Sequence, residues 1–208
     1  MTLTIEDLVS LAPVIPVVVI DDLADAVPLA AALVRGGLPA IEVTLRTPAA
    51  VAAIERIAAE VPDAVVGAGT VTTGRQVAEA LAAGAQFLVS PGTTPTLLDA
   101  LQASGVPFLP GTATPSDIVA LLERGITHAK LFPAEVVGGI AALKAFAGPF
   151  PQMRFCPTGG IDAEKAPEYL AQPNVVCVGG SWMVKSRDWD EVEALSLQAT
   201  GAGRALAR

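Results

Sequence analysis

A lysine within an apolar run is the residue of this chain whose type and position most strongly suggest chemistry. Lys130 lies in the segment THAKLFPAE, residues 127–135, between His128 and Phe132. Burial of an ammonium group is costly, and loss of its proton frees the amine as a nucleophile toward carbonyl groups. The alternative is that the stem of Lys130 lies along a strand while its ammonium reaches water. The segment by itself leaves both possibilities open.

Further polar residues stand at the ends of other apolar, strand-like runs. Glu42, Thr44 and Arg46 lie two positions apart, so their side chains share one face of a strand. Four more runs end in the turns Gly67-Ala68-Gly69-Thr70, Ser90-Pro91-Gly92, Pro157-Thr158-Gly159-Gly160 and Gly179-Gly180-Ser181. If these ends meet at one edge of a sheet, they form a site with an amine, a carboxylate, a guanidinium and open backbone turns.

Each component of such a site suits a definite task. A buried amine can add to a ketone to form a Schiff base, whose protonated imine accepts electrons when a carbon–carbon bond breaks. Glu42 can move protons, and Arg46 can bind a substrate carboxylate through two parallel hydrogen bonds. Glycine turns that open helices offer backbone N–H groups to a phosphate, and Ser181 adds a hydroxyl donor.

A purely structural reading competes with the functional one. Glu42 and Arg46 can form a salt-bridged pair at the mouth of a barrel, and the pairs Gly36-Gly37 and Gly138-Gly139 are expected to be ordinary tight turns. We expect His128 to be a hydrogen-bonded core residue, on the face of the reactive lysine but deeper. The coincidence of the other polar residues on strand ends favours the functional reading.

The apolar runs alternate with helical segments along the whole chain. Helix stops at Gly84, Gly105 and Gly125 recur about every 20 residues, which is room for one strand, one helix and two short loops. Threonine before proline, at residues 47–48, 94–95 and 114–115, predicts capped helix starts. The expected strands are residues 14–20, 40–45, 64–68, 86–90, 106–110, 127–132, 153–158 and 175–180. Expected helices include residues 23–35, 49–60, 139–147 and 163–171, with a loosely held tail from about Thr200.

This alternation predicts an α/β protein. Strands that alternate with helices pair in parallel through right-handed crossovers, and eight such units close naturally into a (β/α)8 TIM barrel. We therefore expect residues 1–208 to form a single barrel domain with a short N-terminal helix. An open doubly wound sheet is the alternative, but no GxGxxG sequence with a following acidic residue comes after the first strand.

Composition limits the partners. The 208 residues are 52% hydrophobic, and 13 basic against 21 acidic side chains give a net charge of -8. An acidic surface argues against nucleic acid or an anionic membrane as the main partner, whereas a small anionic substrate remains possible if arginines gather in a cleft. The apolar stretch of residues 11–20 is too short to span a bilayer, so we expect a cytoplasmic protein.

The two cysteines and the single histidine make a metal site improbable. Cys156 and Cys177 lie on separate predicted strands, and we expect two reduced thiols that fill core volume. One histidine in the whole chain is too few for the usual zinc site of His and Cys ligands. We therefore predict a protein without metal or cofactor.

The segments that carry these residues resemble a known family. VTLRT from Val43, GAGT from Gly67, SPG from Ser90, KLFPAE from Lys130, RFCPTGGI from Arg154 and GGSW from Gly179 resemble the KDPG/KHG aldolases. These are class I aldolases of 2-dehydro-3-deoxy-phosphogluconate, in the Entner-Doudoroff pathway, and of 4-hydroxy-2-oxoglutarate. The likeness runs in order from about Ile5 to Val184 with matching spacing.

The resemblance implies a homotrimeric barrel enzyme that cleaves 2-dehydro-3-deoxy-6-phosphogluconate to pyruvate and glyceraldehyde 3-phosphate without a metal. Lys130 matches the Schiff-base lysine, and Glu42 matches the general acid/base. His128 departs from the family, which has an acidic residue there. The matches to substrate-binding positions are Arg46 and Thr70 at the pyruvate-derived end, Pro91 and Phe132 in its apolar lining, and Thr158, Gly159, Gly160, Gly180 and Ser181 at the phosphate end.

Other functions remain open at this stage. Within the aldolases, 4-hydroxy-2-oxoglutarate and 2-dehydro-3-deoxy-6-phosphogalactonate are alternative substrates. A sugar-phosphate isomerase or epimerase on the same barrel would use the glycine turns without a covalent step, but Glu42 has no obvious second partner except Lys130. A non-catalytic assembly subunit is the third reading, with an apolar surface patch that serves oligomerisation.

Overall fold

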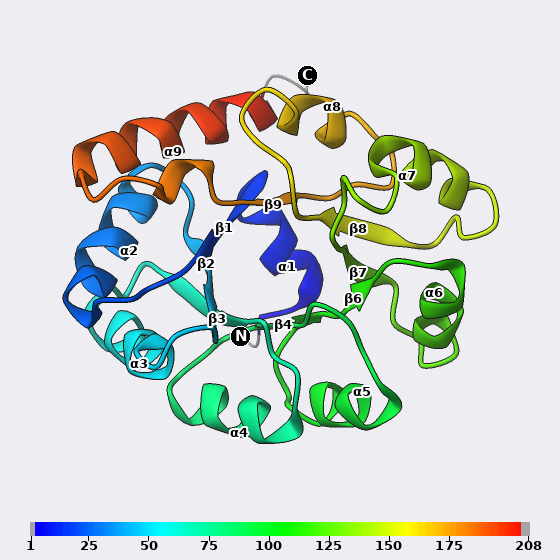
Figure 1. Cartoon of the computed structure of the whole chain (residues 1–208), viewed down its shortest axis with the longest axis horizontal. Coiled ribbons are helices and arrows are strands. Elements are labelled where there is room, and N and C mark those ends of the chain that lie inside the picture. The colour runs from blue at the N-terminus through cyan, green and yellow to red at the C-terminus, as the bar shows by residue number, and fades with distance from the viewer. Residues whose placement is uncertain (1–2, 205–208) are drawn as a thin grey trace.

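Parallel strands occupy the middle of the molecule, and helices α2 to α9 form a ring around them, whereas α1 lies at the centre of the view (Figure 1). The computed structural model describes the backbone of residues 3–204 and the side chains of residues 3–201. The strands are β1 Val14–Val18, β2 Ala40–Thr44, β3 Val65–Gly69, β4 Leu88–Val89, β5 Phe108–Leu109, β6 Gly111–Thr112, β7 His128–Leu131, β8 Arg154–Pro157 and β9 Val178–Gly180. The helices are α1 Ile5–Ser10, α2 Ala26–Arg35, α3 Ala50–Glu60, α4 Gly74–Ala82, α5 Pro95–Gln102, α6 Pro115–Leu122, α7 Gly139–Ala147, α8 Ala166–Leu170 and α9 Trp189–Arg204.

The strands form two parallel sheets that follow one another around the centre. One has the order β5-β4-β3-β2-β1-β9, and the other has the order β6-β7-β8. Two isolated bridges, Phe155 with Val175 and Thr158 with Gly179, connect the β8 region to the β9 region. The expected α/β class is confirmed, with a curled parallel sheet, and the full (β/α)8 barrel stays a prediction.

The fifth expected strand is interrupted, and this corrects the sequence prediction of one strand at residues 106–110. Only Phe108–Leu109 pairs with β4, and Gly111–Thr112 pairs with β7 on the other side. Pro110 separates the two pieces, because proline has no N–H to donate to a neighbouring strand. Its carbonyl still accepts from the N–H of Lys130 at 2.9 Å. The catalytic candidates therefore lie on different sheets, with Glu42 on β2 and Lys130 on β7.

Two of the three predicted threonine caps are confirmed. The hydroxyls of Thr94 and Thr114 accept from the backbone N–H three residues later, and a proline follows each at the first helical position. The prediction for Thr47 was wrong. Its hydroxyl donates instead to the carbonyl of Ile20 at 2.5 Å, and α3 begins at Ala50 without a side-chain cap.

Other boundaries shifted by a few residues. The helix expected at residues 23–35 begins as a 3₁₀ turn, Leu23–Asp25, before α2, and α8 is only five residues long. The tail expected from Thr200 is helical as far as Arg204, and the Thr200 hydroxyl donates to the Gly36 carbonyl at 2.9 Å. Residues 205–208 lie outside the described part of the chain.

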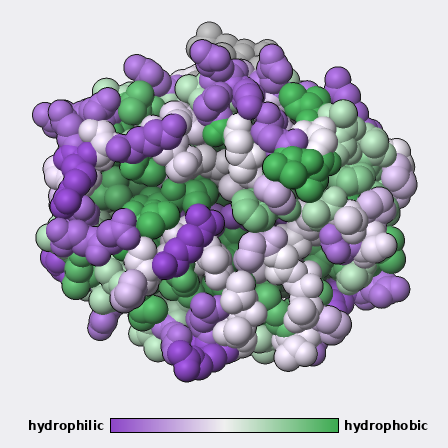
Figure 2. All heavy atoms as spheres, viewed as in Figure 1, coloured by the Kyte–Doolittle hydropathy of each residue, from purple (hydrophilic) through white to green (hydrophobic). Residues whose placement is uncertain are grey.

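Apolar side chains fill the space inside the sheets and between sheets and helices. Cys156 and Cys177 are free and buried in the smaller of two hydrophobic clusters, as expected. Within residues 3–204, no helix combines the length and apolar character needed to cross a membrane. The face seen in Figure 2 has hydrophilic residues at its margin and a recess with apolar residues left of its centre, over the region of β1 and β2.

Candidate active site

Lys130 and Glu42 form a buried ion pair between two strands. The Nζ of Lys130 lies 3.0 Å from Oε1 and 3.3 Å from Oε2 of Glu42. The side chains are 4% and 3% exposed, so Lys130 does not extend its ammonium into water, as the alternative interpretation required. The same Nζ lies 5.4 Å from the ring centre of Phe132. A buried amine thus lies in direct contact with the one group predicted to exchange protons with it.

Gly69 creates the space that Glu42 occupies. It lies at the end of β3, beside Thr44 of β2 in the parallel register. A Cβ at position 69 would lie 2.2 Å from Oε1 of Glu42 and 2.4 Å from its Cγ. Any other residue at position 69 would force this carboxylate to move, so the glycine at the end of β3 serves the packing of the ion pair.

Arg46 and Thr70 meet just past the carboxyl ends of β2 and β3. The Nε of Arg46 donates to the hydroxyl of Thr70 at 3.0 Å. Thr70 has a φ of 60°, and no other non-glycine residue between positions 3 and 204 has a positive φ. Such a conformation is rare for a β-branched residue and is typical of functional sites. The two residues predicted for the carboxylate end of a substrate are therefore in contact.

A pocket of about 140 Å³ opens beside Arg46. It is lined by most of the residues that were predicted to bind the phosphate end of the substrate. A Cβ at Gly179 would lie 2.2 Å from the hydroxyl of Thr158, so this glycine lets the threonine side chain pack at the pocket floor. The lining residues are Val17, Arg46, Phe132, Thr158, Gly159, Gly160, Ile161, Gly179, Gly180 and Ser181.

Pro91 does not line this pocket. The backbone of Pro91 packs against Gly111, where a Cβ would lie 2.2 Å from the Pro91 carbonyl carbon. The hydroxyl of Ser90 accepts from the N–H of Gly111 at 3.2 Å, which ties the two turns together. The structure thus places Pro91 in the contact between two strand ends.

The glycine turns do not open long helices, which corrects the sequence prediction. Gly159 and Gly160 have φ values of 102° and 82°, and α8 begins only at Ala166. Gly180 and Ser181 precede a 3₁₀ turn, Trp182–Val184. Any anion in this pocket would therefore contact single backbone N–H groups rather than the end of a regular helix.

Sequence reasoning missed a group of two charged residues and a tyrosine next to the glycine turn. Glu135, Lys165 and Tyr169 form a network that also reaches the carbonyl of Gly160. Glu135 belongs to the PAE segment that follows Lys130, which was the available signal. The position of Lys165 and Tyr169, at least thirty residues later, depends on the packing of α8 and has no local signature.

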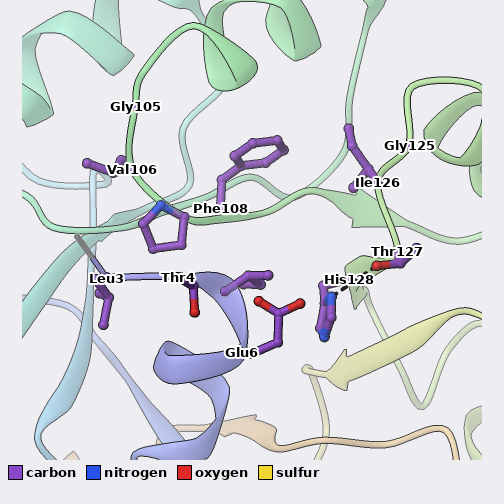
Figure 3. Close-up of a pocket in the computed structure, with 12 residues that line it drawn as sticks. Leu3, Thr4, Glu6, Gly105, Val106, Phe108, Gly125, Ile126, Thr127 and His128 are labelled. Carbon is purple, nitrogen blue, oxygen red and sulfur yellow. Dashed lines mark hydrogen bonds between the residues drawn. The ribbon is translucent and has the colours of Figure 1, made fainter. Parts of the chain in front are cut away.

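His128 lies at the other end of the strands from the pocket beside Arg46. It is half-buried and lines a cavity of about 330 Å³ together with Glu6 of α1 and the residues that lead into β5 and β7 (Figure 3). Its Nδ1 lies 3.2 Å from the Thr127 hydroxyl. The prediction of a core residue was wrong because β7 starts at His128, which places this side chain at the edge of the sheet.

The position of His128 leads to a pH-dependent stability. Burial lowers the pKa of His128 below its ordinary value of 6.5, Glu6 opposes this effect and Arg154 adds to it. The unfolded chain therefore takes up this proton first as the pH falls, so stability decreases as the pH drops below 6.5. When the pH is lowered below 6.5, we expect the Tm of a His128→Asn variant to fall by a few degrees less than the Tm of the unaltered protein. Equal losses would contradict the assignment.

Residues 3–204 contain no group of three or more His, Cys, Asp and Glu side chains arranged to hold a metal ion.

Comparison with known proteins places the chain in one family. The family model of KDPG and KHG aldolase matches residues 5–195. A 2-dehydro-3-deoxy-phosphogluconate aldolase of Pseudoalteromonas atlantica is 51% identical, with 97% of this chain and 96% of that protein covered. The solved 2-keto-3-deoxy-6-phosphogluconate aldolase of Zymomonas mobilis, with 3-phosphoglycerate, is 48% identical with a TM-score of 0.93, and 97% of each chain is covered.

A second solved structure captures a covalent step. The KDPG aldolase of Legionella pneumophila, with pyruvate held as a covalent carbinolamine intermediate, has a TM-score of 0.91 and 47% identity to this chain. The alignment covers 94% of this chain and 97% of that one. The match extends over nearly the whole of the described sequence, and it includes the segments around Glu42 and Lys130. The chain therefore belongs to the family of KDPG and KHG aldolases.

Proposed function

We propose that the protein is a class I aldolase that cleaves 2-dehydro-3-deoxy-6-phosphogluconate to pyruvate and glyceraldehyde 3-phosphate. The contact of Lys130 Nζ with Glu42 at 3.0 Å, inside the sheet and out of water, carries this proposal. An amine and a carboxylate in contact can form a Schiff base and transfer the protons that each step requires. The names of the relatives and the carbinolamine in the Legionella pneumophila structure support the same chemistry.

The reaction begins when Lys130 gives up its proton, which Glu42 can accept directly. The neutral amine attacks the C2 ketone to give a carbinolamine. Glu42 returns the proton to the carbinolamine hydroxyl, which leaves as water, so that a protonated imine and an ionised Glu42 remain. Glu42 then removes the proton of the C4 hydroxyl as the C3–C4 bond breaks, and the imine nitrogen takes the electron pair to give an enamine. Glyceraldehyde 3-phosphate leaves, Glu42 returns the proton to C3, and water releases pyruvate from Lys130.

Different residues bind the two ends of the substrate. Arg46, supported by Thr70, pairs with the C1 carboxylate, and its fixed charge and fork geometry suit that group. Phe132 lies beside the amine and provides an apolar wall, and Pro91 supports the neighbouring strand end. The phosphate end enters the pocket formed by Thr158, Gly159, Gly160, Gly180 and Ser181.

The phosphorylated substrate is favoured over 4-hydroxy-2-oxoglutarate by the glycine-lined pocket. Open backbone turns next to a serine hydroxyl are a common way to hold phosphate in α/β enzymes. A curated relative from Escherichia coli, 48% identical, is named as acting on both substrates. We therefore propose 2-dehydro-3-deoxy-6-phosphogluconate as the preferred substrate and 4-hydroxy-2-oxoglutarate as a second, slower one.

Incubation with pyruvate and sodium borohydride tests this function. Reduction of the imine leaves a stable three-carbon adduct, and we expect peptide mapping to locate it on Lys130. Cleavage of 2-dehydro-3-deoxy-6-phosphogluconate, followed by pyruvate release, measures the complete reaction. A folded protein without adduct and without pyruvate release would contradict the proposal and favour an isomerase or a non-catalytic subunit.

We further propose that the two sheets close into a single (β/α)8 barrel domain, supported by the bridges that connect β8 to the β9 region. We also propose that the protein is a homotrimer in the cytoplasm.

One exposed apolar side chain supports an oligomer. Val136 is 82% exposed, and contact with a neighbouring subunit would remove this side chain from water. The two free cysteines are typical of a reducing compartment. Light scattering of the purified protein measures the oligomeric state.

A further inference from the structure

A network of three side chains holds the glycine turn from outside the substrate pocket. The hydroxyl of Tyr169 donates to Oε1 of Glu135, and Nζ of Lys165 lies 2.6 Å from Oε2. Tyr169 is buried, and burial together with the Glu135 carboxylate raises the pKa of its hydroxyl, which therefore remains a donor. Lys165 and then Tyr169 lower the pKa of Glu135, which therefore remains ionised at neutral pH.

The network contacts the turn at three points. Lys165 Nζ donates to the carbonyl of Gly160 at 3.1 Å, and the N–H of Glu135 donates to the carbonyl of Gly159 at 3.2 Å. The side chain of Glu135 also covers Gly160, where a Cβ would lie 2.5 Å from the Glu135 Cγ. Both carbonyls of the glycine pair are therefore fixed by residues outside the substrate pocket.

The turn separates two pockets. Gly159, Gly160 and Ile161 line the pocket beside Arg46, whereas Glu135 and Lys165 line a different pocket with Tyr169. In a trans peptide the N–H points away from the carbonyl of the same unit. Carbonyls held toward Glu135 and Lys165 therefore direct the N–H groups of Gly160 and Ile161 toward the substrate pocket. Two donors in this orientation suit a phosphate oxygen.

We propose that Glu135, Lys165 and Tyr169 are positioning residues that orient the N–H groups of Gly160 and Ile161 for the phosphate of the substrate. The inference rests on the proposed function and adds a determinant of selectivity between phosphorylated and unphosphorylated keto acids. Lys165 and Glu135 are 45% and 35% exposed, and an ion pair with that exposure contributes little to overall stability. Its role is therefore local, at the turn that it holds.

A Lys165→Met variant tests the proposal, with Lys144→Met on α7 as the control, since Lys144 is another exposed lysine. We expect Lys165→Met to raise the KM for 2-dehydro-3-deoxy-6-phosphogluconate about tenfold, because an oriented charge-assisted contact is lost. The kcat of Lys165→Met for the phosphorylated substrate is expected to stay within about twofold of that of the unaltered protein. Its kcat/KM for 2-dehydro-3-deoxygluconate, which lacks the phosphate, is expected to stay within the same limit. Lys165→Arg is expected to restore most of the affinity, and Lys144→Met to change neither substrate.

Equal losses on both keto acids, or no loss on either, would overturn the proposal and leave the network with a structural role only. Binding of inorganic phosphate, measured by calorimetry on the same variants, separates the proposal from the proposed function. If the unaltered protein has no aldolase activity but Lys165→Met binds phosphate more weakly than it does, the proposed function is rejected and the orientation of the turn is supported. If the unaltered protein is an active aldolase and Lys165→Met binds phosphate equally well, only the orientation of the turn is rejected.

Discussion

Replacement of Lys130 by arginine is expected to lower aldol cleavage by at least about 10³-fold and to abolish borohydride trapping of pyruvate. A guanidinium cannot form the imine, yet it keeps a positive charge beside Glu42. The charge matters because removal of one partner from a buried ion pair costs about 3–5 kcal/mol of stability. The pair here is almost completely buried. Arginine therefore separates loss of chemistry from loss of fold better than methionine does.

The control for this experiment is Lys144→Arg, an exposed position on α7 where the same exchange is expected to leave turnover unchanged. Pyruvate release measures activity, thermal unfolding measures the fold, and mass spectrometry after borohydride locates the adduct. Full turnover by a folded Lys130→Arg protein would reject the Schiff-base mechanism. An adduct on Lys165 in the unaltered protein would reject the assignment of the nucleophile.

Replacement of Glu42 by glutamine is expected to lower kcat by about 10²–10⁴-fold while pyruvate is still trapped on Lys130. The carboxamide keeps the size of the side chain and can accept a hydrogen bond from the amine, so the space made by Gly69 stays filled. It cannot accept a proton from the C4 hydroxyl or return one to C3. Glu55→Gln, on the exposed face of α3, is the matched control.

Proton exchange at the methyl group of pyruvate isolates this role of Glu42 from cleavage. In heavy water the enamine on Lys130 takes up deuterium at C3 only through an acid that has exchanged with solvent. We expect the unaltered protein to exchange the methyl protons rapidly and Glu42→Gln to exchange them at least about 10²-fold more slowly. Undiminished exchange would mean that another group, or water alone, carries this proton.

The central pair of the site could be predicted from the sequence, because strand alternation and parallel strand ends are strong constraints. Alternation placed Glu42 and Arg46 on one face, and the structure brings Glu42 to Lys130 and Arg46 to Thr70. These contacts need only that each residue lies near the end of its strand. The class of fold followed from the same regular alternation.

What sequence reasoning missed depends on details of loops and edges. The strand break at Pro110 arises because proline has no N–H for the neighbouring strand. The displaced cap at Thr47 arises from a contact with a neighbouring segment, the carbonyl of Ile20. His128 was misplaced because the start of β7 could not be fixed to one residue. Lys165 escaped notice because a surface lysine just before a short helix gives no local sign of the turn that it holds.

The interruption at Pro110 divides the proposed active-site residues between two pieces of chain. Glu42, Arg46 and Thr70 belong to the part before it, and Lys130 with the glycine turn belongs to the part after it. Neither part contains both members of the ion pair. Under the proposed function, the release of pyruvate requires that both parts of the chain be assembled. Two separately expressed fragments, cut near this proline, would therefore report their own reassembly by the pyruvate they release.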